Sequence, residues 1–364
     1  LAAFVVLILQ PEALISVSFQ MSFAAVIALV AAYEGWRAHE ARHGFAQQRG
    51  AWVRTMRYFQ AVIFSTLVAE AAINPLSVYH FNQLALYGIA GNLVAIPLTS
   101  LWIMPWGVAA FLLMPLGWEA APLWLMGQGI ELLLATARNV AAAPGAVLIL
   151  PTPPFASLLL FVAGGLWLCL WRTRLRLLGL AVIAAAAMPI LWAKTPDMLV
   201  ADSGQPVAVR GEDGRLLLSS RGGQRFVRES WLRREGARQA RRWMDDLAWQ
   251  ARHQAICDAL GCALRLGPAG DRLAWRLALP ADAAAFAEDC RHADILVTAL
   301  PAPKACPAPM LIIDAARLAH EGGHAVYFTM KDGTPGLRVE TVAAARGRRP
   351  WVPGAMRRTT EPGP

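Results

Sequence analysis

Between Glu70 and Arg138 the sequence contains no lysine or arginine, and its only charged residues are Glu119 and Glu131. Roughly a quarter of the residues of an ordinary water-soluble domain are charged, so a gap of this length is foreign to one. A helix that crosses the hydrocarbon core of a bilayer needs about 20 apolar residues. The gap therefore predicts membrane-embedded helices, and it excludes a soluble enzyme as a description of the whole chain.

Polarity divides the chain into two parts. Residues 1–193 are apolar, whereas Lys194–Pro364 is polar and rich in arginine, glycine and proline. We expect a polytopic α-helical membrane domain over 1–193, a soluble α/β domain over 194–342 and a disordered basic tail over 343–364. The sequence opens inside an apolar run and without an initiator methionine, which indicates a piece of a longer protein whose N-terminal part is missing.

Six segments are expected to span the membrane: Pro11–Tyr33, Tyr58–Tyr79, Gln83–Met114, Glu119–Ala142, Phe155–Trp171 and Leu177–Ala193. Arginines cluster in two of the connecting segments, Glu34–Arg57 and Arg172–Arg176. Basic residues near the ends of spans stay on the cytoplasmic side. Four expected spans separate the two clusters, an even number, so both can lie inside. The polar C-terminal part is then predicted to be periplasmic, attached to a multi-pass protein of the bacterial inner membrane.

Polar side chains within the spans are the first candidates for function: Gln20, Glu70, Asn74, Asn82, Gln83, Asn92, Gln128 and Glu131. Such groups are costly in lipid and often mark a transport path. The alternative is that they only hydrogen-bond between helices and hold the bundle together. Three prolines, Pro75, Pro97 and Pro105, are expected to break helical backbone, which is tolerated where a helix lines a cavity.

Two motifs resemble a known family. Ser18-Phe-Gln-Met-Ser-Phe23 is similar to the Phe-Gln-Leu-Ser-Phe signature of the ComEC family of competence proteins, and Gly91-Asn-Leu-Val-Ala-Ile-Pro97 is similar to its Asn-Leu-x-x-x-Pro segment. The resemblance implies an inner-membrane channel component that translocates single-stranded DNA into the cytoplasm during natural transformation. Its implied partners are single-stranded DNA, membrane lipids, and other competence proteins, namely a DNA receptor and a cytoplasmic motor. The expected pathway residues are Phe19, Gln20, Ser22, Glu70, Asn74, Asn92 and Pro97.

The polar part is predicted to mix helices and strands. One hairpin is expected from Val207–Arg210 and Arg215–Ser219 around the turn Gly211–Gly214, and a second from Ala325–Met330 and Leu337–Val342. The continuous apolar runs Ile295–Leu300 and Met310–Ile313 are typical of buried strands. Glu229–Leu260 is expected to be helical.

In many members of the resembled family a metallo-β-lactamase-like domain follows the membrane core. Here Asp202-Ser-Gly-Gln-Pro206 replaces its opening Asp-Val-Gly-Gln-Gly, and the metal-binding His-x-His-x-Asp-His cluster is absent from the sequence. We therefore expect a degenerate relative with no metal, no cofactor and no catalytic residues. The segment His320-Glu-Gly-Gly-His324 matches the zinc-peptidase pattern, but its two glycines oppose the helix that such a site needs.

Four cysteines lie in the polar part: Cys257, Cys262, Cys290 and Cys306. A periplasmic location permits disulfides. Cys257 and Cys262 could close a small loop and Cys290 and Cys306 a second one, although spacing does not fix the connectivity. A zinc site built from all four is the alternative.

A group of arginines interleaved with tryptophan is the candidate contact for single-stranded DNA, namely Arg233, Arg234, Arg238 and Trp243. Cationic and stacking side chains together suit a single strand. The alternative is a solvated helical face with tryptophans in the core. Two other functions remain open, a membrane transporter of lipid-linked or small anionic solutes and a membrane-anchored periplasmic hydrolase. The missing metal cluster argues against the hydrolase.

Overall fold

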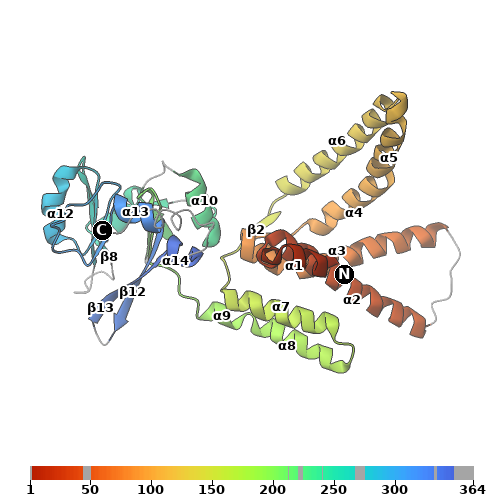
Figure 1. The fold of residues 1–364 in the computed structure, drawn as a ribbon, viewed down its shortest axis with the longest axis horizontal. Helices are drawn as coiled ribbons and strands as arrows, with labels where there is room; N and C mark the ends of the chain where they lie inside the picture. The colour runs from red at the N-terminus through yellow and green to blue at the C-terminus, as the bar shows by residue number, and fades with distance from the viewer. Residues whose placement is uncertain are drawn as a thin grey trace. The chain divides into compact units, whose positions relative to one another are not determined.

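The computed structural model describes residues 2–43, 51–211, 213–219, 224–239, 241–266, 275–331 and 334–347. The chain divides into two compact units, with the boundary in the sequence between Ala193 and Lys194, and each unit is described by itself (Figure 1). The first unit is built from helices and the second contains two β-sheets. The expected fold class, a helical membrane part followed by a soluble α/β part, is confirmed.

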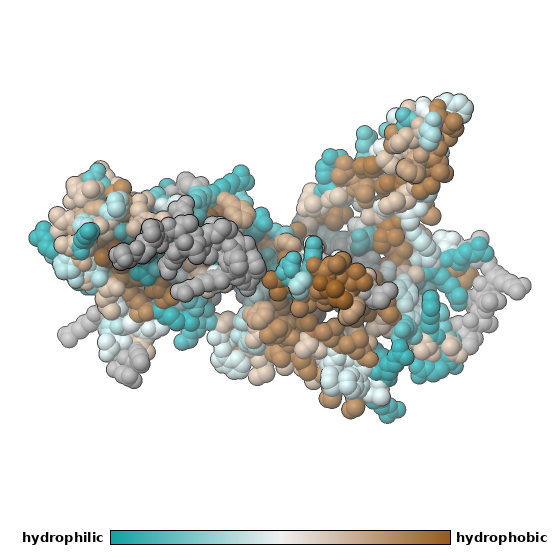
Figure 2. Space-filling view, in the orientation of Figure 1, coloured by the Kyte–Doolittle hydropathy of each residue, from teal (hydrophilic) through white to brown (hydrophobic). Residues whose placement is uncertain are grey.

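The helices of the first unit are α1 Ala2–Leu9, α2 Val17–His43, α3 Ala51–Phe81, α4 Gly88–Leu98, α5 Met104–Leu113, α6 Ala120–Ala142, α7 Phe155–Leu170, α8 Leu178–Ala185 and α9 Met188–Leu191. Five stretches are long and apolar enough to cross a membrane, namely Val17–Arg42, Trp52–Phe81, Gly88–Leu116, Ala120–Ala142 and Arg174–Leu191. The sixth expected span is the shorter apolar helix α7, of 16 residues. Large apolar side chains cover the outside of these helices, as lipid contact requires (Figure 2).

Consecutive helices of this unit pack in pairs, α2 with α3, α5 with α6, and α7 with α8. Glycine makes the last pairing close, because a Cβ added at Gly164 would lie only 2.7 Å from the carbonyl oxygen of Gly179. Small residues let membrane helices approach in this way. A two-stranded ribbon, β1 Gln83–Ala85 antiparallel to β2 Val147–Ile149, connects the end of α3 to the segment after α6.

Not every expected proline break is present. Helix α3 runs without interruption through Pro75, so the break expected there is wrong. The helix that begins at Gly88 does become irregular after Pro97, where a π-helical turn, η2 Thr99–Ile103, separates α4 from α5. Pro105 then lies in the first turn of α5, a position where the missing N–H costs little.

In the second unit one sheet has six strands in the order β13-β12-β3-β4-β5-β6 and the other has five in the order β11-β10-β9-β8-β7. The first contains β3 Met198–Val200, β4 Val207–Arg210, β5 Leu216–Leu218, β6 Arg241–Arg242, β12 His324–Lys331 and β13 Thr334–Thr341. The second contains β7 Ile256–Cys257, β8 Gly261–Leu266, β9 Trp275–Pro280, β10 Ile295–Val297 and β11 Leu311–Ile313. One core cluster takes Met198 and Val209 from the first sheet and Leu277 and Ile295 from the second, so the sheets pack face to face.

Both expected hairpins and both buried strands are confirmed. Strand β4 pairs antiparallel with β5, and β12 with β13, while β10 and β11 lie side by side in parallel. The remaining helices are α10 Arg225–Arg234, α11 Leu247–Arg252, α12 Phe286–His292, α13 Ala315–Glu321 and α14 Val342–Arg346.

Two expectations for this unit are wrong. Residues 229–260 do not form one helix, because α10 ends at Arg234 and Gly236 follows with the left-handed φ of 72° that stops helices. The tail is not irregular from its start, since the Thr341 hydroxyl accepts from the backbone N–H of Ala344 and caps α14. The rest of the tail, residues 348–364, lies outside the described residues.

Candidate translocation pathway

Gln20 connects the first two long helices of the membrane unit. It lies in the first turn of α2, where its amide nitrogen donates to the carbonyl oxygen of Leu14 (3.1 Å). Its Oε1 lies 2.9 Å from Nε2 of His80, near the end of α3. Two half-buried polar groups thus satisfy each other inside an apolar bundle, which lowers the cost of their burial. Sequence reasoning did not single out His80, although a histidine directly after the expected span Tyr58–Tyr79 was the available signal.

The other motif residues around Gln20 have different environments. The rings of Phe19 and Phe23, one helical turn apart, pack with their centroids 4.4 Å from each other. The backbone N–H of Phe19 donates to the Ser16 hydroxyl (3.3 Å), which caps the start of α2. Ser22 is exposed on the helix surface. The motif therefore positions Gln20 at a capped helix start and gives it an aromatic neighbour.

Glu70 lies at the start of another helix. Its carboxylate occupies the space beside Gly88, the first residue of α4, where a Cβ would collide with Oε1. The N-terminus of a helix carries a partial positive charge and unpaired N–H groups, which favour an anion. This arrangement gives a mid-span carboxylate a favourable environment, and it requires glycine at position 88.

The expected pathway residues do not meet in one polar cluster. Among the described residues, no hydrogen bond joins Gln20, Glu70, Asn74 or Asn92 to another member of this set. Asn74 and Asn92 are half-buried on α3 and α4. Pro97 lies in the last turn of α4, two residues before the π-helical turn η2 begins.

Asn82 has a structural role instead. It is 9% exposed and has a left-handed φ of 59°, which asparagine tolerates better than most residues. Its amide nitrogen donates to the Leu150 carbonyl (3.2 Å) and to the Thr152 hydroxyl (2.7 Å). These bonds close the ribbon between β1 and β2, as expected of a residue that only holds the bundle together.

A cavity of about 740 Å³ lies between α2, α3, α7 and α8, and the sequence analysis did not predict it. Small residues form much of its wall, including Ala31 and Gly35 on α2 and Ala72 on α3. Four helices contribute, so no single span carries a pattern that would reveal it. None of the expected pathway residues lines the cavity.

One end of the cavity is charged. Glu34, Arg42, Arg172 and Arg176 all line it, and Nη2 of Arg172 donates to Oε2 of Glu34 at 3.3 Å. The pair joins the two arginine-rich segments predicted to share one side of the membrane. Both side chains are largely exposed, so the pair adds little to stability.

In the second unit, Trp243 cannot contact DNA, which corrects the sequence prediction. Its side chain is fully buried in the core, where its ring stacks on that of Trp249 with the centroids 6.0 Å apart. Arg233, Arg234 and Arg238 are exposed, as a nucleic-acid contact requires. The exposed aromatic side chain on the same helix as Arg233 is Phe226, 82% exposed, which was missed because Trp243 was the more obvious choice.

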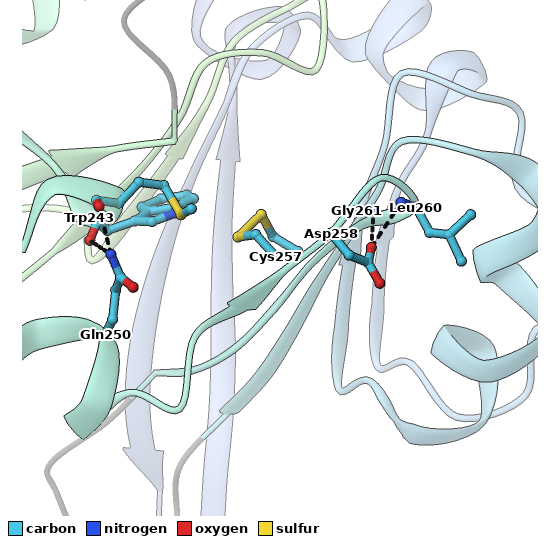
Figure 3. Close-up of a disulfide and its surroundings, with 8 residues drawn as sticks. Trp243, Gln250, Cys257, Asp258, Leu260 and Gly261 are labelled. Carbon is cyan, nitrogen blue, oxygen red and sulfur yellow. Dashed lines mark hydrogen bonds between the residues drawn. A yellow bond between two sulfur atoms is a disulfide. The ribbon is translucent and has the colours of Figure 1, made fainter. Parts of the chain in front are cut away.

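All four cysteines of the second unit form disulfides. Cys257 pairs with Cys262 across the turn between β7 and β8, and Cys290 on α12 pairs with Cys306. Figure 3 shows the first bond and the turn that it closes, in which Asp258 accepts from the backbone N–H groups of Leu260 (2.8 Å) and Gly261 (3.0 Å). Cys169, half-buried in α7, is a free thiol.

The zinc-peptidase pattern is split between two elements. Glu321 ends α13, whereas His324 begins β12, so the intervening glycines end the helix. The buried imidazole of His324 pairs through Nε2 with Oε2 of Glu321 (3.0 Å), which also accepts from Nε of Arg317 (3.0 Å). Burial lowers the pKa of His324, and Glu321 only partly opposes this shift. In the part of the chain that the structure describes, no three metal-binding side chains converge.

Comparison with known proteins finds a family similar to the membrane unit. Residues 1–175 match the family model described as Competence protein. The match covers α1 to α7 and therefore both motifs that carried the resemblance. No curated protein and no solved structure gives a significant match to the chain.

Proposed function

We propose that this chain, whose residues 1–175 match the Competence protein family model, is the inner-membrane channel component that moves single-stranded DNA into the cytoplasm during natural transformation. The observation that carries the proposal is the family match, which covers four of the five stretches long and apolar enough to cross a membrane. The match supports a place for the chain in a DNA-uptake system with other competence proteins. A DNA receptor and a cytoplasmic motor are the partners we propose.

The proposed orientation follows from charge. Arg172 in the α7–α8 turn pairs with Glu34 in the C-terminal half of α2, so both arginine-rich segments lie toward one end of the membrane unit. Basic segments stay cytoplasmic, which makes this the inner end. The ribbon of β1 and β2, reached through the full length of α3, then lies at the outer end. The segment after α9 starts from that end, and disulfides in the second unit suit a periplasmic location.

The proposed path through the membrane uses the polar groups of α2, α3 and α4. The Gln20–His80 pair offers a donor and an acceptor near the outer end. Asn92 lies on the helix whose backbone becomes irregular at η2, a feature tolerated at membrane depth beside protein or water rather than lipid. Neutral amides can exchange hydrogen bonds with a passing phosphodiester without holding it.

For the second unit we propose a non-catalytic, degenerate metallo-β-lactamase-like domain. Asp202–Pro206, which replaces the opening motif of that domain, lies beside the end of the buried strand β10, since a Cβ added at Gly204 would lie 3.1 Å from the backbone nitrogen of Ala299. Purified Lys194–Pro364 supplied with zinc or manganese should leave single-stranded DNA intact. Metal-dependent cleavage that is lost on changing His320 or His324 would refute this proposal.

The decisive experiment measures DNA uptake in a strain that lacks the chromosomal gene. Radiolabelled DNA should bind to the cell surface of this strain but should not reach the cytoplasm as single strands, and the intact gene should restore entry. Normal entry in the deletion strain would overturn the proposal. If uptake is normal while a lipid-linked or small anionic solute accumulates, the alternative transporter function would be correct.

A further inference from the structure

The cavity between α2, α3, α7 and α8 has the build of a lipid site. Its volume of about 740 Å³ lies within the range of about 300–1,000 Å³ found for ligand pockets. Much of its lining is apolar, with Val68, Phe161, Leu168, Leu180 and Ile183 facing it. Apolar side chains on four membrane helices suit an acyl chain, and they offer nothing to a strand of phosphodiesters along most of the cavity.

The charged groups gather where the helices end. Arg172 and Arg176 belong to the short turn between α7 and α8, and Arg42 lies in the last turns of α2. The carboxylate that faces them is Glu34, which pairs with Arg172. Arg42 donates through Nε to the backbone carbonyl of Ala38, and no carboxylate among the described residues pairs with Arg176. Three guanidinium groups against one carboxylate leave a net positive rim.

Arginine at such a rim is suited to phosphate. The guanidinium presents a planar fork that binds phosphate through two hydrogen bonds at once. The Arg172–Glu34 pair is exposed and weak, so a phosphate can displace the carboxylate or bind beside it. Basic pockets between membrane helices on the cytoplasmic side bind anionic lipid headgroups for this reason.

Tryptophans place the rim at headgroup level. Trp167 and Trp171 stack with their centroids 4.3 Å apart at the end of α7, and Nε1 of Trp167 donates to the Leu175 carbonyl (3.0 Å). Trp36, two residues after Glu34 on α2, packs on Phe64. Tryptophan is enriched where the bilayer meets water, so the arginines lie level with the phosphates of the surrounding leaflet.

We propose that this cavity binds a phospholipid with an anionic headgroup, its phosphate held by Arg172 and Arg176 and its acyl chain lying between α2, α3, α7 and α8. The site depends on the membrane placement of these helices and not on DNA transport. A lipid in this position would brace the α7–α8 hairpin against α2 and α3. The membrane unit would then be more stable in bilayers that contain anionic lipid.

The chain has a built-in reporter for this site. Cys169 lines the cavity, and the other four cysteines are held in disulfides. The experiment compares the rate at which a maleimide labels Cys169 in the full chain reconstituted in phosphatidylcholine vesicles, with and without phosphatidylglycerol. We expect labelling several-fold slower with phosphatidylglycerol, and lipid extraction of the purified protein should recover phosphatidylglycerol in preference to phosphatidylcholine.

Matched variants test the role of the arginines. Changing Arg172 and Arg176 together to glutamine should remove the protection, whereas Arg174→Gln, in the same turn but outside the cavity, should keep it. Lysine at both positions should retain part of the protection and shows whether a loss is one of charge or of folding. The proposal would be overturned by equal labelling rates in both kinds of vesicle, or by an equal loss of protection with Arg174→Gln. It would also be overturned if a single-stranded oligonucleotide protected Cys169 in vesicles of phosphatidylcholine alone. DNA uptake in cells is measured separately, so failure here leaves the transport function standing.

Discussion

Nη2 of Arg172 lies 3.3 Å from Oε2 of Glu34, although 138 residues separate the two in the sequence. The contact brings the turn between α7 and α8 to the C-terminal half of α2. Two arginine-rich segments, assigned to the same side of the membrane by counting spans, are therefore neighbours in space. The relationship supports the parity of the spans, because an odd number of crossings between these segments would have placed them at opposite ends.

Topology is the first prediction. A reporter fused after Gly204 should behave as periplasmic, so that alkaline phosphatase is active and green fluorescent protein is dark. A fusion within the α7–α8 turn, after Thr173, serves as the control and should give the reverse pattern. Fluorescence from the Gly204 fusion would show that the second unit is cytoplasmic.

The polar groups of the proposed path give the second prediction. Gln20→Leu should reduce DNA uptake several-fold, because His80 loses its partner and the proposed path loses an amide that would exchange hydrogen bonds with the passing strand. Asn92→Leu should reduce uptake as well, with protein abundance near normal in both cases. Uptake of labelled DNA and immunoblots of membranes provide the measurement. Val26→Leu, on the exposed surface of α2, is the control. Full uptake in both Gln20→Leu and Asn92→Leu would show that these residues are only helix contacts.

Local patterns predicted much of the fold. Apolar length located the spans, and the turn at Gly211–Gly214 located the β4–β5 hairpin, because each depends on neighbouring residues alone. The end of α10 was missed, since arginine, alanine and tryptophan continue beyond it in a helix-like composition and only Gly236 marks the stop.

The candidate site was less accessible to sequence reasoning. The Gln20–His80 contact joins residues 60 apart, and the cavity depends on how four helices pack. Trp243 was misassigned for the same reason, because an arginine-flanked tryptophan has the same sequence context on a surface as in a core. Its burial depends on the pairing of two sheets contributed by distant segments.

Close packing of α7 on α8 leads to the third prediction. Gly164→Leu or Gly179→Leu should destabilise the membrane unit by about 1–3 kcal/mol, because a side chain at either position meets the backbone of the opposite helix. The measurement is the midpoint of thermal aggregation in detergent. Gly165→Ala is the matched control, since no atom lies within 4 Å of a Cβ added there. Equal midpoints for Gly164→Leu and Gly165→Ala would contradict the packing.

The fourth prediction concerns the disulfides. Mass spectrometry of non-reduced protein from membranes should find no free thiol at Cys257, Cys262, Cys290 or Cys306. Replacing Cys290 and Cys306 by alanine should cost about 3 kcal/mol of unfolding free energy in Lys194–Pro364, against about 2 kcal/mol for Cys257 and Cys262, because the first pair closes the longer loop. Urea unfolding measures both. Free thiols at all four positions, or zinc released by acid, would favour a reducing compartment or a metal site.

Acidification should destabilise the second unit through His324. The ring is buried against Glu321 and burial lowers its pKa, so the unfolded chain takes up a proton first, near the ordinary value of 6.5. The free energy of unfolding should therefore fall as the pH drops below about 6.5 and should continue to fall until the folded histidine is protonated. Burial opposes ionisation of Glu321, but hydrogen bonds from Arg317 and His324 outweigh it and lower the pKa of Glu321. The contribution of Glu321 to the free energy of unfolding is therefore lost at still lower pH, in the same direction.

Urea unfolding of Lys194–Pro364 at a series of pH values is the measurement. The free energy of unfolding should depend less steeply on pH in His324→Asn. His320→Asn, at an exposed position in the last turn of α13, should keep the wild-type dependence. Equal slopes in all three proteins would assign the pH dependence to other groups.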